Sequence, residues 1–338
     1  YLYYYKNESQ LKKSVDLKKK GVAYFNLDVV YHNNPVDNVT SLFQDFHNGN
    51  PIDGEQLVTL NYRLTNFKLA HDLSKNLRLV HGGSLLYKNS YYYLNTNEFF
   101  LGDEINGIKQ IQYYGGLNYI PIDGLNITGA VHFLRYSFPT YLSGGSGMGG
   151  MGGMGTSSIY LPGYSGNFLS SRISAYKYIG LINIGGGISY STLNYKKQLQ
   201  KDYRLVIYPL GNLNLYTVST VFQVSDEDDL DKQNYTSLKQ EVGFKALGNI
   251  WMEAMLQFGE IKNYTDHNGF CIYNGNDTQT SRFDFSLIHT GLKSNIRLMA
   301  SYLEYYNYYF DLTNYRSSEL NKIESSGLTF IGEISWKF

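Results

Sequence analysis

The chain has 338 residues, a length compatible with one large domain or two ordinary ones. Tyrosine and glycine each occur 34 times, and charged residues make up only 17% of the chain, which favours strands and turns over helices. Its 29 basic and 29 acidic residues cancel, so the charge balance does not suggest a nucleic-acid partner. The single cysteine, Cys271, excludes an internal disulfide and a cysteine-based metal cluster.

Segments in which apolar and polar residues alternate recur along the whole chain, as expected for strands whose side chains point to opposite faces. The predicted strands are 22–32, 56–69, 77–88, 108–120, 125–136, 168–179, 181–193, 202–208, 212–223, 235–247, 250–261, 281–290, 295–307 and 327–338. Short connections that contain turn residues alternate with long polar connections. This rhythm predicts about fourteen antiparallel strands joined in sequence.

The last predicted strand has one apolar face and one mostly polar face. The apolar face holds Leu328, Phe330, Gly332, Ile334, Trp336 and Phe338. This strand resembles the closing strand of bacterial outer-membrane β-barrels, in which a terminal Phe follows alternating outward apolar residues. Phe330, Trp336 and Phe338 are therefore the candidate residues for barrel closure and for an assembly signal. The alternative for this segment alone is the edge strand of a soluble sheet.

The resemblance implies an all-β fold, a transmembrane antiparallel up-and-down β-barrel of about fourteen strands with short periplasmic turns and long extracellular loops. Such a barrel pairs its backbone groups without free edges, as lipid requires. We expect it in the bacterial outer membrane with both termini periplasmic. Residues 1–21 are expected to form a periplasmic leader and 22–338 a single barrel domain, with a flexible Gly/Met-rich loop at 143–158.

The polar face of the terminal strand assigns an inward face to its neighbours, and arginines of earlier strands are predicted to point the same way. Charged residues are placed inside because a lone charge facing lipid costs about 2–4 kcal/mol. The predicted lumen-lining residues are Arg63, Arg78, Arg204, Lys239, Glu241, Glu253, Arg282, Asp284, Arg297 and Glu333. Both signs occur, which predicts ion pairs; whether these line a conduit or brace a filled barrel stays open. Tyr31, Tyr62, Tyr113 and Tyr119 are predicted to lie in the interfacial girdles.

The sequence offers no constellation of catalytic or metal-binding residues. Its seven histidines are scattered without an HExxH motif, and neither GxSxG nor a phosphate-binding loop occurs. The glycine run at 185–187 lies inside a predicted strand, where it permits curvature or close packing. The acidic run at 226–229 is interpreted as a solvated loop. We therefore predict no enzyme activity, no catalytic residue, no metal and no cofactor.

Two functions from different classes remain open. The first is a passive, porin-like channel for small polar solutes. The second is a non-conducting structural or accessory subunit of a larger outer-membrane protein complex. Long-chain fatty-acid channels also have about fourteen strands, but their N-terminal hatch carries an Asn-Pro-Ala segment that this sequence lacks. The expected partners are outer-membrane lipid, the barrel-assembly machinery through the C-terminal strand, and other outer-membrane or periplasmic proteins, with no nucleic acid.

Overall fold

The computed structural model describes residues 22–33, 54–96, 99–100, 104–143, 158–193, 197–227, 232–266, 271–272, 278–311 and 320–338. The long strands are β1 (Val22–Asn33), β2 (Gly54–Asp72), β3 (Leu77–Thr96), β5 (Glu104–Tyr119), β6 (Leu125–Ser143), β7 (Ser158–Ile179), β8 (Ile182–Ser191), β9 (Lys197–Ile207), β10 (Leu215–Glu227), β11 (Lys232–Leu247), β12 (Ile250–Ile261), β15 (Thr278–Thr290), β16 (Ser294–Asp311) and β17 (Leu320–Lys337). Three strands have two residues each: β4 (Phe99–Phe100), β13 (Thr265–Asp266) and β14 (Cys271–Ile272). The part of the chain described here contains no helix of the length and apolarity needed to span a membrane.

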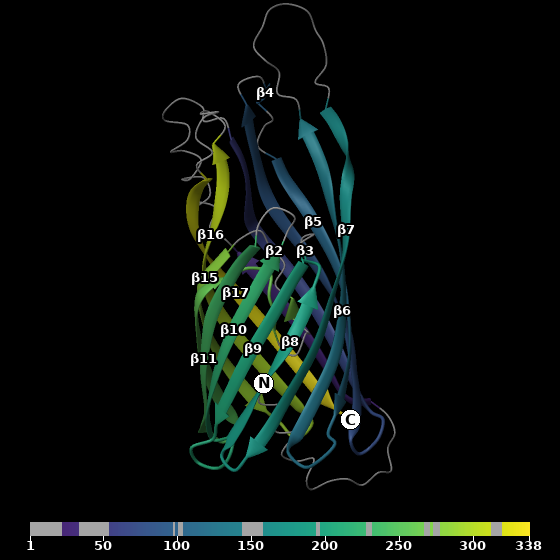
Figure 1. Ribbon diagram of the computed structural model, residues 1–338, viewed down its shortest axis with the longest axis vertical. Coiled ribbons are helices and arrows are strands. Elements are labelled where there is room, and N and C mark those ends of the chain that lie inside the picture. Colours follow the sequence, from purple (N-terminus) through teal and green to yellow (C-terminus); the bar gives the residue numbers. More distant parts are fainter. Residues whose placement is uncertain are drawn as a thin grey trace, which may run out of the picture.

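The 14 long strands form one closed antiparallel barrel within the described residues (Figure 1). Each pairs with the next along the chain, and β17 closes the ring by pairing with both β16 and β1. At the seam, the backbone N–H of Phe338 donates to the carbonyl oxygen of Ala23 at 3.3 Å. The predicted all-β antiparallel barrel of about fourteen strands is confirmed.

The short connections gather at one end of the barrel, which we call the turn end (Figure 1). Four of these turns contain a glycine with positive φ, at Gly124, Gly180, Gly211 and Gly248. Such a backbone conformation strains residues that carry a Cβ, so glycine is the residue that makes these tight turns. The opposite end, towards which β6 and β7 extend, we call the loop end.

Side chains alternate between an outer and an inner wall along each strand. In β12, Trp251, Glu253, Met255 and Gln257 are buried inside, whereas Leu256 is exposed on the outer wall. The outer wall carries most of the exposed aliphatic and aromatic side chains, and the inner wall carries most of the buried Ser, Thr, Asn, Gln and charged side chains. A polar interior inside an apolar exterior is the arrangement expected of a barrel surrounded by lipid.

An apolar cluster lies inside the barrel towards the turn end. It consists of Val206, Tyr208, Tyr216, Val218, Trp251 and Ile288, with Tyr178 and Leu213 packed against it. We call it the aromatic cluster. The polar side chains described below lie on β7, β9, β11, β12, β15 and β16, most of them further towards the loop end than this cluster.

Some predicted segments lie outside the described residues. These are the leader at 1–21 and residues 144–157 of the Gly/Met-rich loop. Ser143 ends β6 and Ser158 begins β7, so the two boundary positions of that predicted loop belong to strands.

Candidate functional site on the inner wall

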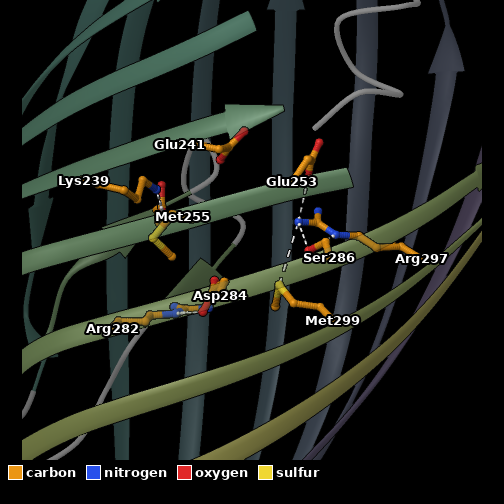
Figure 2. Close-up of a pocket in the computed structure, with 10 residues that line it drawn as sticks. Lys239, Glu241, Glu253, Met255, Arg282, Asp284, Ser286, Arg297 and Met299 are labelled. Atoms are coloured by element: carbon orange, nitrogen blue, oxygen red, sulfur yellow. Dashed lines mark hydrogen bonds and ion pairs between the residues drawn. The ribbon is translucent and has the colours of Figure 1, made fainter. Parts of the chain in front are cut away.

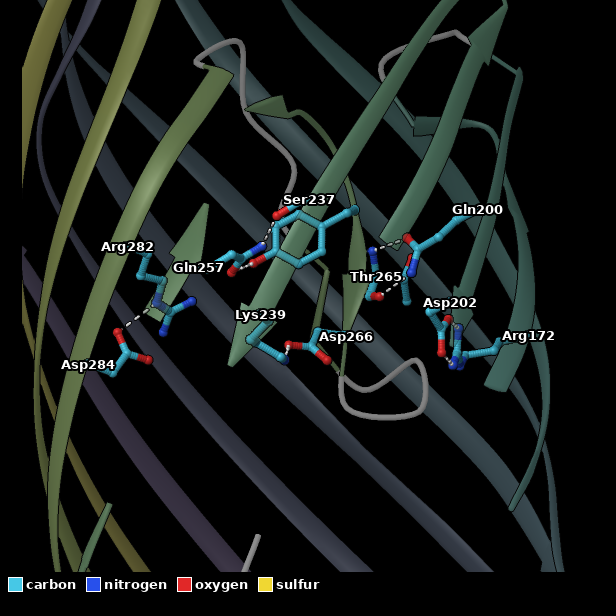
Figure 3. Close-up of polar contacts among 11 residues, drawn as sticks. Arg172, Gln200, Asp202, Ser237, Lys239, Gln257, Thr265, Asp266, Arg282 and Asp284 are labelled. Atoms are coloured by element: carbon cyan, nitrogen blue, oxygen red, sulfur yellow. Dashed lines mark hydrogen bonds and ion pairs between the residues drawn. The ribbon is translucent and has the colours of Figure 1, made fainter. Parts of the chain in front are cut away.

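A set of charged side chains crosses the inner wall from β7 to β16, and we call it the charged belt (Figures 2 and 3). It consists of Arg172, Asp202, Lys239, Glu241, Glu253, Asp266, Arg282, Asp284 and Arg297. Apart from Asp266, which belongs to the short strand β13, these residues lie on strands of the barrel at positions whose side chains face the interior. The period of two therefore brings charges from distant parts of the chain into one layer.

Most of the belt is made of ion pairs. The Arg172 guanidinium donates two parallel hydrogen bonds to Asp202, with Nη1–Oδ1 at 2.6 Å and Nη2–Oδ2 at 2.8 Å. Arg282 Nε lies 2.7 Å from Asp284 Oδ1 on the same strand. The side chains of both pairs are buried, so each charge depends on its partner for the interactions that water would otherwise supply.

Arg297 connects three strands of the belt. Its Nη2 lies 2.9 Å from Glu253 Oε2, and the same nitrogen and Nε donate to the Ser286 hydroxyl at 2.9 and 3.1 Å. Glu253 also accepts a short hydrogen bond from the hydroxyl of Tyr216, which belongs to the aromatic cluster. Figure 2 shows Arg297 reaching towards Glu253, with the Ser286 hydroxyl beside its guanidinium.

The chain from Ile261, the last residue of β12, to Asp266 of β13 turns into the barrel, and we call it the inward segment. Within it, Ile261, Tyr264 and Thr265 are between 1% and 2% exposed. Ile261 and Tyr264 pack with Phe222 and Val224 of β10 in a second interior apolar cluster. The segment therefore lies against the inner wall and occupies space inside the barrel.

Polar contacts hold the inward segment to three strands (Figure 3). Thr265 N–H donates to Gln200 Oε1 at 2.8 Å, and Gln200 Nε2 donates to the Thr265 carbonyl at 2.7 Å. The Tyr264 hydroxyl donates to Gln257 Oε1 at 3.3 Å, and Asp266 forms a short ion pair with Lys239. Because these contacts reach β9, β11 and β12, the segment narrows the interior at the level of the belt.

A cavity of about 70 Å³ remains beside the inward segment. Its lining includes Lys239, Asp266, Arg282 and Arg297, so both signs of charge face it. A space of this size holds a few water molecules. The arrangement can hydrogen-bond a small polar molecule at this level of the barrel.

The structure places most of the predicted lumen-lining residues on the inner wall. Lys239, Glu241, Glu253, Arg282, Asp284 and Arg297 come together in the charged belt. Arg204 also faces inward, with its guanidinium carbon 5.7 Å from the centre of the Tyr176 ring. Arg78 lies near the turn end, paired with Asp72 at 2.6 Å, and Glu333 accepts a hydrogen bond from Asn26 Nδ2 at 2.6 Å.

Arg63 is different, because it lies on the outer wall. It is exposed and sits over the ring of Tyr31, which is itself 41% exposed. Tyr62, predicted for a girdle, instead faces inward and stacks on buried His32, with the two ring centres 4.6 Å apart. The faces of β2 were predicted in reverse because the sequence argument assumed that charged residues face inward along the full strand. At the middle of β2, the outer wall carries the polar side chains of Asn61 and Arg63.

The residues of the terminal strand lie as follows. Phe330, Trp336 and Phe338 are on the outer wall and are 52%, 46% and 76% exposed. The strand that carries Phe330 and Trp336, β17, pairs with β1 and closes the barrel. Their part in recognition by the barrel-assembly machinery stays a prediction.

Several interior residues were missed by the sequence argument. Strand β9 begins at Lys197 rather than near 202, so Gln198 and Gln200 were not assigned to the inner wall. The signal was present: residues 198, 200, 202 and 204 are polar, and Leu199, Tyr203 and Leu205 alternate with them. Asp226, predicted in a solvated loop, is a buried residue of β10 that accepts from Gln198 Nε2 at 2.7 Å.

The fold resembles that of solved outer-membrane barrels, although neither a family model nor a curated protein matches the sequence. A Pseudomonas aeruginosa FadL homologue aligns with a TM-score of 0.55 and 11% identity over 95% of this chain and 91% of that one. The P. putida toluene transporter TodX aligns with a TM-score of 0.56 and 9% identity over 98% of this chain and 92% of that one. The Ralstonia pickettii toluene transporter TbuX aligns with a TM-score of 0.55 and 9% identity over 98% of this chain and 94% of that one. The predicted class-level resemblance to bacterial outer-membrane β-barrel proteins is confirmed.

Proposed function

We propose that this chain is a transport barrel of the bacterial outer membrane that passes small polar solutes through a narrow conduit. The charged belt lines the conduit, and the inward segment narrows it. The turn end, where β1 begins and β17 ends, would face the periplasm. The proposal assigns no catalytic residue and no cofactor.

The observation that carries this proposal is the belt of paired charges on the inner wall. Paired Arg, Lys, Asp and Glu side chains offer both donors and acceptors to a passing solute, and rings of charged side chains set selectivity in known pores. Their burial supports a narrow conduit over a wide one, since Glu253 is 2% and Asp284 6% exposed. A wide water-filled pore would leave such side chains in contact with solvent.

A second candidate function is the passage of small apolar or aromatic molecules. The aromatic cluster places Tyr208, Tyr216 and Trp251 inside the barrel near the turn end. Two of the solved barrels with this fold carry the description of toluene transporter. The charged belt argues against this candidate, because an apolar solute would have to pass buried charges that gain nothing from it.

Swelling of liposomes that contain the purified barrel separates these candidates. We expect neutral sugars to enter at rates that fall steeply with solute size. Protein-dependent entry of toluene without sugar entry would favour the second candidate. Rates equal to those of protein-free liposomes for every solute would instead favour the non-conducting accessory subunit.

A matched pair of variants tests the role of the belt. Arg282→Gln leaves Asp284 without its ion-pair partner, so the conduit becomes more acidic. Sugar acids should then enter more slowly relative to neutral sugars of the same size. Lys201→Gln removes a cation from the outer wall, where Lys201 lies between Ile188 and Gln223, and should leave this ratio unchanged. An unchanged ratio in the Arg282 variant would contradict a conduit through the belt.

A further inference from the structure

Four outer-wall side chains on adjacent strands alternate between aromatic and cationic residues, and the two from β2 and β3 lie at mid-strand. Tyr31 of β1 lies directly opposite Arg63 of β2, Arg63 opposite Tyr87 of β3, and Tyr87 opposite Lys109 of β5. We call these four residues the outer-wall row. Directly opposite side chains are the closest neighbours in a sheet, so the row forms one continuous surface.

Each cation of the row lies over an aromatic ring. The guanidinium carbon of Arg63 is 5.9 Å from the centre of the Tyr31 ring, and Lys109 Nζ is 5.8 Å from that of Tyr87. The two tyrosines are 41% and 54% exposed. The rings therefore hold the cations in place on the surface while leaving them accessible.

A groove runs beside the row. It has a volume of about 400 Å³ and is lined by Tyr31, Asn61, Arg63, Tyr87 and Asn89. Asn89 Nδ2 donates to Asn61 Oδ1 at 3.0 Å, which fixes the two amides at the edge of the groove. The groove thus combines a planar cation, two ring faces and two amides.

The outer wall below the row, towards the turn end, is apolar. Val29, Phe67, Leu85 and Leu117 are between 43% and 53% exposed there. Arg135 of β6, opposite Ile111, extends the positive charge beyond Lys109. Among the outer-wall side chains described on β1, β2, β3, β5 and β6, none is acidic. The row therefore forms a positive patch at the upper border of an apolar surface.

We propose that the outer-wall row binds the phosphorylated sugar head group of an outer-leaflet glycolipid. The Arg63 guanidinium offers paired donors that match phosphate oxygens, and Lys109 supplies a second cation. Sugar rings lie against the exposed faces of Tyr31 and Tyr87, and hydroxyl groups bond to the amides. The acyl chains cover the apolar wall below. The site requires a barrel wall in contact with lipid and rests on the proposed orientation, in which the turn end faces the periplasm, but it does not depend on an open conduit.

Native mass spectrometry of the folded barrel in mild detergent tests this site. The probe is a bisphosphorylated, acylated glucosamine disaccharide, compared with its dephosphorylated form, a zwitterionic phospholipid and inorganic phosphate. We expect tight binding of the bisphosphorylated glycolipid only. The double variant R63Q/K109Q should lose about tenfold or more in affinity, whereas K201Q on the far outer wall should bind like the wild type.

The single variant R63K provides a test with minimal change to the fold. It keeps the charge but loses the planar pair of donors, so its affinity should lie between those of the wild type and the double variant. Wild-type affinity in the double variant would overturn the proposal. Equal binding of the dephosphorylated glycolipid or phospholipid would indicate a general lipid contact, and equal binding of inorganic phosphate a free-anion site; either result also overturns it.

Discussion

Arg172 and Asp202 form their two-bond ion pair across an intervening strand because Gly187 lies between them. Gly187 of β8 is directly opposite Asp202 of β9, and a Cβ at Gly187 would lie 2.4 Å from Arg172 Nη2. Arg172 Nη1 also donates to Ser189 of β8 at 3.1 Å. Because Gly187 has no side chain, the Arg172 guanidinium can cross β8 to reach Asp202. The glycine run at 185–187 serves close packing here.

The substitution Gly187→Ala should push the Arg172 guanidinium away from Asp202. Overpacking of this kind costs about 1–3 kcal/mol in the free energy of unfolding. The measurement is denaturant unfolding from phospholipid vesicles, followed by tryptophan fluorescence. Gly129→Ala is the control, because nothing lies within 4 Å of a Cβ built there. Equal unfolding curves for the two variants would contradict this account of Gly187.

Removing one partner of the same pair should be more costly than replacing both. Asp202→Ala leaves a buried guanidinium without its carboxylate, and we expect a loss of about 3–5 kcal/mol in the free energy of unfolding. The double variant R172M/D202L removes both charges and fills the space, so it should recover most of that loss. A double variant as unstable as Asp202→Ala would show that the pair itself stabilises the barrel.

A second side chain also crosses a glycine to reach the next strand but one. A Cβ at Gly243 would lie 2.2 Å from Tyr216 Cζ, and the Tyr216 hydroxyl reaches Glu253 beyond it. Tyr216→Phe removes this donor from a buried carboxylate, with an expected cost of about 1–3 kcal/mol. Tyr203→Phe, on the outer wall and 55% exposed, should change stability little. The same vesicle-based unfolding experiment compares the two variants.

The outer wall should behave as a lipid-facing surface. Ile173 in β7 and Ile122 in a turn are both 60% exposed, so exposure alone does not distinguish them. Ile173→Lys places a charge among lipid chains and should cost about 2–4 kcal/mol, whereas Ile122→Lys should cost far less. Equal, small effects on unfolding from vesicles would contradict a membrane-embedded wall.

The number of strands and most of their faces could be predicted from the period of two. In β15 the polar residues Arg282, Asp284 and Ser286 alternate with Phe283, Phe285 and Leu287, and this pattern predicts an inner face on which the structure shows buried side chains. The inner and outer faces of β2 were predicted in reverse because the lipid-facing band is shorter than the strand. Above that band, Arg63 lies outside and Tyr62 inside, and hydropathy alone does not mark where the band ends.

The inward segment could not be predicted from the sequence. Tyr264 and Thr265 carry no periodic pattern, and their position depends on contacts with Gln200, 65 residues from Thr265 along the chain. The path of Arg172 over Gly187 likewise depends on the register of three strands. Long-range register and loop packing are properties of the closed barrel and leave no local signal.

The central claim is that the inward segment narrows a polar conduit, and single-channel conductance in a planar bilayer tests it most directly. We predict small, discrete steps for the wild type. Asp266→Asn weakens the contact with Lys239 that holds the segment and should give larger steps. The control Glu304→Gln removes a carboxylate that accepts from Ser281 at 2.6 Å on the outer wall, and should conduct like the wild type. Silence from folded wild type and Asp266→Asn alike, or equal steps from both, would contradict the account.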